Sequence, residues 1–337
     1  EAIVEGVGAF AAGEFAPLNR VGDLEGAVLE NGVVRLPDGF EAAYQNYVEQ
    51  GWNAIASSEE FGGQGLPWAL AFPIQEMWQG ANMAFGLCPL LNQGAVEAIH
   101  HHGSDAQKAQ YLPKLISGEW TGTMNITEPA AGSDLGLIRS RAEPEGDHYK
   151  IFGQKIYITY GEHDMADNII HLVLARLPNA PDDVRGISLF IVPKILEDGT
   201  RNDVKCTGLE HKLGIHASPT CVVNLENARG WLVGDENKGM RSMFTMMNAA
   251  RLNVGILNMC NRPVRLMLQP TTDVGITHRC EWMVLHAAFL ERHSLYKQMA
   301  LINRSSGIRE SRANYHFVLT HQAGKSLGDR TNIAFFC

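Results

Sequence analysis

Apolar residues recur at helical spacing through much of the first third of the chain, which predicts a series of helices. A first helix is predicted over 40–50, where aromatic side chains share one face. Two more apolar segments follow at Trp68–Gly80 and Ala84–His101. Ser104 begins a further helix, because Gln107 three residues later completes the pattern of a capping box.

The pattern then changes to short runs of β-branched or alternating apolar residues, separated by turns rich in glycine and aspartate. These predicted strands are His148–Ile158, Asn168–Ala175, Gly186–Val192 and Cys221–Leu225. Helical spacing returns over Gly239–Ile256, where a methionine-rich face is more typical of packed core than of a ligand site. The fold class is therefore α+β, with an antiparallel β domain between helical regions, and not a βαβ nucleotide-binding sheet.

Composition changes near residue 256. The first 256 residues carry a net charge of −14 and thirty glycines, whereas residues 257–337 carry a net charge of +5 and four glycines. The sequence therefore predicts four parts: a helical domain over 1–120, a β domain over 121–235, a first bundle helix over 236–256, and a distinct tail over 257–337.

Charge and cysteine content exclude several classes of protein. The overall net charge of −9 argues against nucleic acid as a partner, and no apolar run is long enough for a membrane span. The six cysteines form no CxxC pair and are expected to be core thiols of a reducing compartment. No residues have the spacing of a metal site. Because the chain starts at Glu1 without a signal peptide, we interpret it as a fragment of a cytoplasmic protein.

The candidate functional residues lie over 120–134, where the helical pattern of apolar residues ends and the β pattern begins. Glu128-Pro129 cannot continue a helix, and Ala131-Gly132-Ser133 allows close approach to the backbone. Exposed N–H groups and the Ser133 hydroxyl suit a phosphate or a ring carbonyl. These residues indicate an anion or cofactor loop, with an ordinary linker as the alternative. Gly62-Gly63-Gln64-Gly65, by contrast, predicts only a tight turn between helices.

Several motifs occur together in one order, and they resemble the FAD-dependent acyl-CoA dehydrogenase family over about residues 40–256. The motifs are Tyr111–Leu115, Gly118-Glu119, Thr127–Asp134, Gly153–Thr159 and Gly234–Met240. The segment Glu210–Thr220 is similar to the larger bacterial members, among them the 3-methylmercaptopropionyl-CoA dehydrogenases. The resemblance implies an N-terminal helical domain, a middle β domain and a C-terminal helical bundle, which in this chain is truncated or aberrant.

The resemblance also implies site residues and FAD as the cofactor. The positions that it implies for cofactor binding are Met124, Ile126, Thr127, Gly132, Ser133, Tyr157, Ile158 and Thr159. Thr127 is expected to bond the flavin ring, and Ser133 to reach the flavin phosphates and the CoA moiety. Tyr157 stands where many members have tryptophan, and either ring can pack on a flavin. Ser133, Met247 and Arg251 are the implied substrate residues, although Arg251 could equally be a helix-surface cation.

The implied reaction is α,β-dehydrogenation of an acyl-CoA thioester, with electrons passed to an electron-transfer flavoprotein. It requires a carboxylate base, and neither family position is filled, because Ala250 precedes Arg251 and the tail glutamates (Glu281, Glu291, Glu310) match no motif. We therefore expect a fragment that lacks its base, with a tail that is out of frame or divergent. An acyl-CoA oxidase-like flavoenzyme and a non-catalytic flavin or acyl-CoA binding module are the alternatives. The intact family member is expected to be a homo-oligomer.

Overall fold

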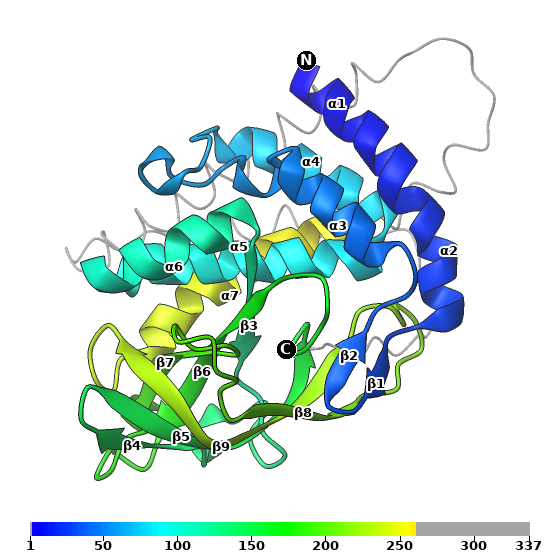
Figure 1. Ribbon diagram of the computed structural model, residues 1–337. Coiled ribbons are helices and arrows are strands. Elements are labelled where there is room, and N and C mark those ends of the chain that lie inside the picture. Colours follow the sequence, from blue (N-terminus) through cyan, green and yellow to red (C-terminus); the bar gives the residue numbers. More distant parts are fainter. Residues whose placement is uncertain (1, 261–337) are drawn as a thin grey trace, which may run out of the picture. The chain divides into compact units, whose positions relative to one another are not determined.

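The computed structural model describes residues 2–260 (Figure 1). The chain begins with α1 (Ala2–Phe10) and α2 (Ala16–Glu25), joined by a π-helical turn over Ala11–Phe15. The wider turn changes the phase of the helix, so that Phe10 and Phe15 both point into an aromatic cluster around Trp78.

Four further α-helices complete the helical region. They are α3 (Phe40–Glu49), α4 (Trp68–Ala81), α5 (Met83–His102) and α6 (Asp105–Ser117). Short 3₁₀ helices lie between α3 and α4, at Trp52–Ala54 and Glu59–Phe61, and the glycine-rich segment forms the predicted turn after the second. The predicted capping box is confirmed, because Ser104 and Gln107 exchange both hydrogen bonds at the start of α6.

Seven strands follow and form one sheet. They are β3 (Trp120–Asn125), β4 (Arg141–Glu145), β5 (His148–Thr159), β6 (Asn168–Arg176), β7 (Ile187–Pro193), β8 (Val204–Leu209) and β9 (Thr220–Val233). Pairing runs from β6 through β4, β5, β9 and β7 back to β6, so the sheet closes on itself. A separate hairpin of β1 (Val28–Glu30) and β2 (Val33–Arg35) places Val34 against the inside of this sheet.

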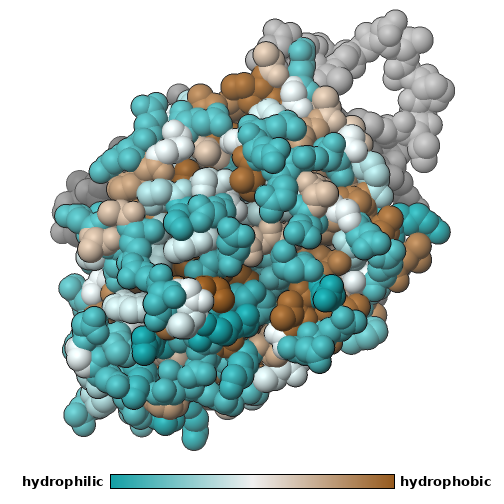
Figure 2. All heavy atoms as spheres, in the orientation of Figure 1, coloured by the Kyte–Doolittle hydropathy of each residue, from teal (hydrophilic) through white to brown (hydrophobic). Residues whose placement is uncertain are grey.

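Alternation along the buried strands divides the apolar residues between two cores. One, the helix-side cluster, joins the outer face of the sheet to α5, α6 and α7 (Gly239–Cys260), and includes Ile170, Leu172, Leu174, Leu189, Ile191, Ala95, Ile99, Leu115, Met243 and Met246. The other, the sheet-interior cluster, includes Ala142, Ile151, Ile158, Val173, Ala175, Phe190, Val192, Val223 and Leu225. The buried Met243 and Met246 confirm that the methionine-rich helix face is core. Polar residues cover most of the face shown in Figure 2.

The β domain contains strands that the sequence did not predict, at 120–125, 141–145 and 204–209, and β9 runs to Val233, eight residues past its predicted end. Residues 120–125 form β3, and β3 pairs with β6 in parallel, so the domain is not wholly antiparallel. The helix α7 begins at Gly239 as expected but runs to Cys260, four residues past the predicted end. The rest of the predicted tail lies outside the described residues. Over the part of the chain that is described, no helix is both long and apolar enough to cross a membrane.

Gly122 allows α5 to lie directly against β3. A Cβ added at this position would stand 2.3 Å from Ala95 Cβ, closer than two non-bonded carbon atoms can approach. We expect Gly122→Ala to cost about 1–3 kcal/mol of unfolding free energy, because α5 must move away from the strand. Chemical denaturation monitored by circular dichroism measures this. Gly80→Ala near the end of α4, where a Cβ meets nothing within 4 Å, should instead leave stability unchanged or raise it slightly.

Candidate functional site

An exposed turn lies between β3 and β4, and residues 129–134 are called the arch here. Glu128 and Ala131 bond each other through both main-chain groups, with N–O distances of 2.9 and 3.0 Å. Beyond this small bridge, Gly132 and Ser133 are exposed. A Cβ at Gly132 would make only ordinary contact with Thr127, so the surface above the arch is open. The arch therefore presents main-chain groups and one hydroxyl to a ligand.

The start of the arch is anchored by a buried ion pair. Lys155 of β5 is fully buried, and its Nζ donates to Glu128 Oε1 at 2.8 Å and to the carbonyl of Ile126 at 3.1 Å. The Glu128 carboxylate also accepts the backbone N–H groups of Arg139 (2.7 Å) and Ser140 (3.1 Å). This one pair thus connects β5 to the main chain on both sides of the arch.

Burial has opposite effects on the two members of this pair, because it disfavours both charges. It lowers the pKa of Lys155 to about 8, although the Glu128 carboxylate acts against the shift. Burial alone would raise the pKa of Glu128, but the charge and hydrogen bond of Lys155 and the bonds from Ser140 and Arg139 bring that pKa below its usual value. At neutral pH we therefore treat both groups as charged.

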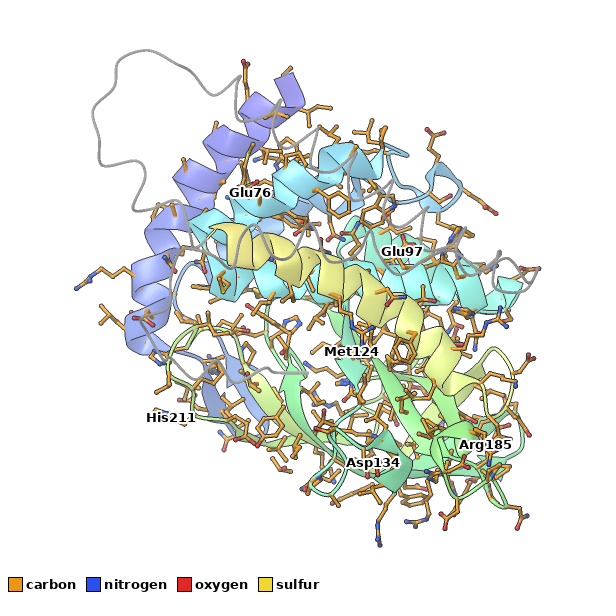
Figure 3. All side chains as sticks on the ribbon, turned by 180° about the vertical axis from the view of Figure 1, so that it is seen from behind. Glu76, Glu97, Met124, Asp134, Arg185 and His211 are labelled. Carbon is orange, nitrogen blue, oxygen red and sulfur yellow. The ribbon has the colours of Figure 1, made fainter. Side chains whose placement is uncertain are left out.

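The far end of the arch is anchored by Arg176 at the end of β6. Its guanidinium donates to the carbonyls of Ile138 and Gly136 at 2.8 and 2.7 Å. It also donates to the carbonyls of Pro181 and Asp183, so it links the turn after the arch to the neighbouring turn before β7. Figure 3 shows these two turns side by side, marked by Asp134 and Arg185. The exposed arch is therefore held at both ends.

A second exposed feature comes from the end of β5. The register of β5 against β9 shifts between Lys155 and Ile158, which is a β-bulge. Within it Tyr157 has a φ of 59°, a left-handed conformation that is strained for a bulky residue, and the residue is 47% exposed. The Ile156 N–H donates to the Thr127 carbonyl at 2.9 Å, which fixes the bulge beside the arch.

The other predicted cofactor positions have different surroundings. Ile158 is buried in the sheet-interior cluster, so only its main chain could face a ligand. The Thr159 carbonyl accepts a 2.7 Å hydrogen bond from the Thr123 hydroxyl. Met124 and Ile126 are half-buried and pack against the helix-side cluster. Their partly exposed side chains therefore place apolar groups near the arch.

The two predicted substrate residues on α7, Met247 and Arg251, differ in how far they are exposed. Met247 packs, half-buried, against the same cluster as Met124, which lies beneath α7 in Figure 3. Arg251 is exposed, and its guanidinium stacks on Phe244 at 5.3 Å and donates to Asn248 Oδ1 at 3.3 Å. These contacts lie on its own helix. The structure thus brings Met247 to the side of the sheet that carries Met124, and leaves Arg251 on the surface of α7.

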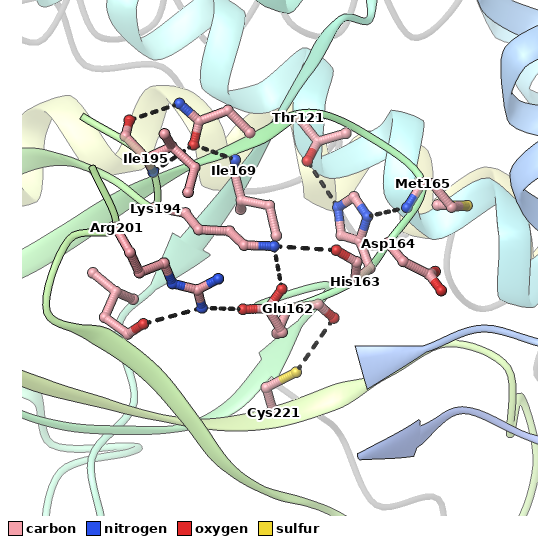
Figure 4. A network of polar contacts seen from close by, with 12 residues as sticks. Thr121, Glu162, His163, Asp164, Met165, Ile169, Lys194, Ile195, Arg201 and Cys221 are labelled. Atoms are coloured by element: carbon pink, nitrogen blue, oxygen red, sulfur yellow. Dashed lines mark hydrogen bonds and ion pairs between the residues drawn. The ribbon is translucent and has the colours of Figure 1, made fainter. Parts of the chain in front are cut away.

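A second buried network supports the segment that follows Thr159 (Figure 4). Glu162 pairs with Lys194 through one carboxylate oxygen and with Arg201, at 2.7 Å, through the other. His163 accepts the Met165 N–H through Nδ1 (3.2 Å), so its Nε2 must donate to the Thr121 hydroxyl at 2.8 Å. Burial, together with the charge of Lys194, lowers the pKa of His163 to about 3.

Sequence reasoning missed both anchors of the arch, Lys155 with Glu128 and Arg176. One signal was available, since Lys155 shares the alternation phase of the apolar Ile151 within a predicted strand. A lysine in phase with buried positions must find a partner, but the sequence does not say which one. Arg176 gave no such signal, because its partners are main-chain carbonyls, and the two in the turn after the arch are about 40 residues away in the chain.

The donor set of the arch and bulge fits an FAD. The exposed residues Gly132 and Ser133, with the Ser133 hydroxyl, suit phosphate oxygens, while the exposed Tyr157 and the half-buried Met124 and Ile126 suit an apolar ring system. In the described residues no group of three or more histidine, cysteine, aspartate or glutamate side chains could hold a metal ion.

Comparison with known proteins gives matches along the same regions. The family model of the acyl-CoA dehydrogenase N-terminal domain matches residues 1–119, and that of the middle domain matches residues 123–228. A 3-methylmercaptopropionyl-CoA dehydrogenase of Ruegeria pomeroyi is 53% identical over 261 residues, which are 76% of this chain and 44% of that protein. A butyryl-CoA dehydrogenase of Syntrophomonas wolfei is 42% identical over 71% of this chain and 42% of its own length.

Solved structures agree on the fold. An acyl-CoA dehydrogenase from Geobacillus kaustophilus has a TM-score of 0.69 at 24% identity, covering 89% of this chain and 79% of its own. An acyl-CoA dehydrogenase from Bacillus anthracis, complexed with FAD, has a TM-score of 0.64 at 26% identity over 77% of this chain and 41% of its own. The chain spans less than half the length of the two curated relatives. With two family domains matched in order, it belongs to the acyl-CoA dehydrogenase family of FAD-dependent oxidoreductases.

Proposed function

We propose that this chain carries the flavin site of an enzyme that oxidises short acyl-CoA thioesters between the α and β carbons. The observation that supports it most is the junction of the anchored arch with the bulge at Tyr157, joined by the bond from Ile156 N to Thr127 O. The substrate class rests on the two curated relatives, which are named as a 3-methylmercaptopropionyl-CoA dehydrogenase and a butyryl-CoA dehydrogenase.

The residues of the chain would share the work of binding. Ser133 and the N–H groups of the arch would hold the phosphates of FAD, Thr127 would bond the ring, and Tyr157 would pack on it. Ser133 would also contact the CoA moiety, with Met247 and Arg251 on the acyl side. FAD, when bound, supplies the two-electron redox chemistry, and the protein supplies orientation and electrostatics. The thioester carbonyl needs hydrogen-bond donors, because its α-proton is otherwise too weakly acidic.

The base that removes this proton is absent from the matched positions. Ala250 stands before Arg251, where a minority of the family carries a glutamate, and we propose that this chain by itself binds FAD without completing the reaction. The intact enzyme is proposed to pass electrons to an electron-transfer flavoprotein and to form a homo-oligomer. The buried free thiols Cys88, Cys206 and Cys221 favour a reducing compartment such as the cytoplasm.

A visible absorption spectrum tests the proposal. The purified chain is expected to show flavin bands, with about one FAD per chain. Anaerobic addition of 3-methylmercaptopropionyl-CoA or butyryl-CoA should shift these bands without bleaching them. Rapid bleaching would contradict the missing base, and peroxide formation in air would identify an oxidase instead. A protein that remains colourless with added FAD would contradict the flavin site.

Tyr157 should show a conflict between stability and binding. Replacing it by glycine removes the strain of its positive φ, so we expect Tyr157→Gly to raise the unfolding free energy of the FAD-free protein by about 1 kcal/mol. The same change removes the exposed ring and should weaken FAD binding roughly tenfold. Tyr157→Phe, which keeps the ring and the strain, is the control for both measurements. Unaltered FAD affinity in Tyr157→Gly would show that the ring makes no contact with the cofactor.

A further inference from the structure

The chain contains two buried lysine–glutamate pairs in the same β domain, and they differ in what they hold. Lys155 with Glu128 contacts the main chain at Ile126, Arg139 and Ser140, on both sides of the arch. Lys194 with Glu162 contacts the carbonyl of His163 and the side chain of Arg201, and the contacts described above for this pair do not include the arch.

A contribution to stability does not by itself explain why the Lys155–Glu128 pair is buried beside the arch. A buried ion pair is often no more stabilising than apolar residues of similar volume, so its presence calls for another explanation. Here Lys155 bonds the carbonyl of Ile126, the residue before Thr127. It also neutralises the side chain of Glu128, whose main chain begins the bridge from which the arch extends. Moving either charge would move the Thr127 main chain and the arch together.

We infer that Lys155 and Glu128 are positioning residues that set the affinity of the arch for FAD, by fixing the main chain from Ile126 to Ala131 before the cofactor arrives. This inference rests on the proposed function and adds to it a pair that does not itself face the cofactor site. A site that is ordered in advance binds more tightly, since less freedom is lost on binding.

Two matched variants test the inference. Lys155→Met and Lys194→Met each remove a buried ammonium group from a glutamate partner, so both should lower stability, the second by less because Glu162 keeps its bond to Arg201. Only Lys155→Met is expected to weaken FAD binding, by about tenfold or more, whereas Lys194→Met should stay within about threefold of the wild type. Fluorescence titration of free FAD into each FAD-free protein gives the dissociation constants.

Glu128→Gln keeps the test valid if Lys155→Met does not fold. Its single amide oxygen can accept only one of the Arg139 and Ser140 N–H groups, which bond different oxygens of the Glu128 carboxylate, and the ion pair is lost as well. FAD affinity should fall in this variant as well. Equal weakening by the Lys155 and Lys194 variants, or FAD affinity within threefold of the wild type in both arch variants, would overturn the inference.

A pH profile separates positioning from stability. Glu128 is the charged group that faces the Lys155 amine, and the amine's other partner is the uncharged Ile126 carbonyl. Because the pKa of Lys155 is about 8, wild-type FAD affinity should fall between pH 8 and pH 9.5 as the amine loses its proton. The same loss in Lys155→Met would contradict the inference.

Hydrogen exchange gives a reading without FAD. In the cofactor-free protein, Lys155→Met should speed exchange at the Ala131 and Ile156 amides, which bond Glu128 and Thr127, while Lys194→Met leaves them protected. If the wild type binds no FAD, the proposed function fails, and this exchange result still decides whether the pair fixes the arch. Unchanged protection in Lys155→Met would reject it.

Discussion

Lowering the pH from 7 to 5 is expected to destabilise the protein by about 3 kcal/mol, because two buried histidines resist protonation. Burial is the main reason that the pKa values of His163 and His171 fall to about 3. In the unfolded chain both groups titrate near their ordinary value of about 6.5. Between these values the unfolded state binds more protons, so stability rises with pH over this window and is lost as the pH falls through it.

The geometry explains why His163 cannot take a second proton in place. Its Nδ1 accepts the Met165 N–H and its Nε2 donates to Thr121, so a proton on Nδ1 would face a donor. The Nδ1 of His171 likewise lies 3.2 Å from the Asn125 amide nitrogen. Each imidazole should therefore contribute roughly 1 kcal/mol per pH unit below about pH 6.5.

Urea denaturation at a series of pH values measures this slope. His163→Asn should reduce it by about half, because one of the two depressed groups is gone. Replacing the exposed His211 by asparagine should leave the slope as it is. A wild-type protein equally stable at pH 5 and pH 7 would show that these side chains are already accessible to protons in the folded state.

Glu162→Gln is the second variant for which a large loss is expected, about 3 kcal/mol of unfolding free energy. The carboxylate is 3% exposed and neutralises Lys194, which is 10% exposed, and Arg201, which is 40% exposed. Arg201 can turn to solvent when the charge is removed, but Lys194 stays buried without its partner. An uncompensated buried charge costs far more than a lost surface contact.

Glu226→Gln is a matched control from the same sheet. Glu226 pairs with Lys205 at 3.3 Å, and both side chains are more than half exposed, so its loss should cost less than about 1 kcal/mol. The double variant Glu162→Gln with Lys194→Met should recover part of the stability lost by Glu162→Gln alone, since the only cation then left without its partner is the part-exposed Arg201. Equal losses in the two glutamate variants would mean that the Glu162 site is open to water.

Local sequence signals predicted much of the fold, and long-range pairing accounts for what they missed. The capping box of α6 and the turn at Gly62 need only a few neighbouring residues, and both are as expected. The strand β3, with the sequence Trp-Thr-Gly-Thr-Met-Asn, has few β-branched apolar residues. It is a strand because β6 pairs with it and α5 covers it.

The sequence indicated the parts of the candidate site as separate motifs, without their arrangement in space. The arch and the bulge at Tyr157 were picked out by motif, and their roles toward FAD remain predictions. Their proximity depends on a bond between Ile156 and Thr127, which no local pattern specifies. The anchoring residues were missed for the same reason, because Lys155 and Glu128 are 27 residues apart in the chain.

The closed sheet also bears on how the protein behaves in a crowded solution. Exposed edge strands recruit strands from other molecules, and closing a sheet removes its edges. In the described sheet only β3 and β8 lie outside the closed circuit of strand pairing, and each is paired along one edge, β3 with β6 and β8 with β9. The β domain therefore offers few free edges from which aggregation could begin, even while a newly made chain still awaits its cofactor.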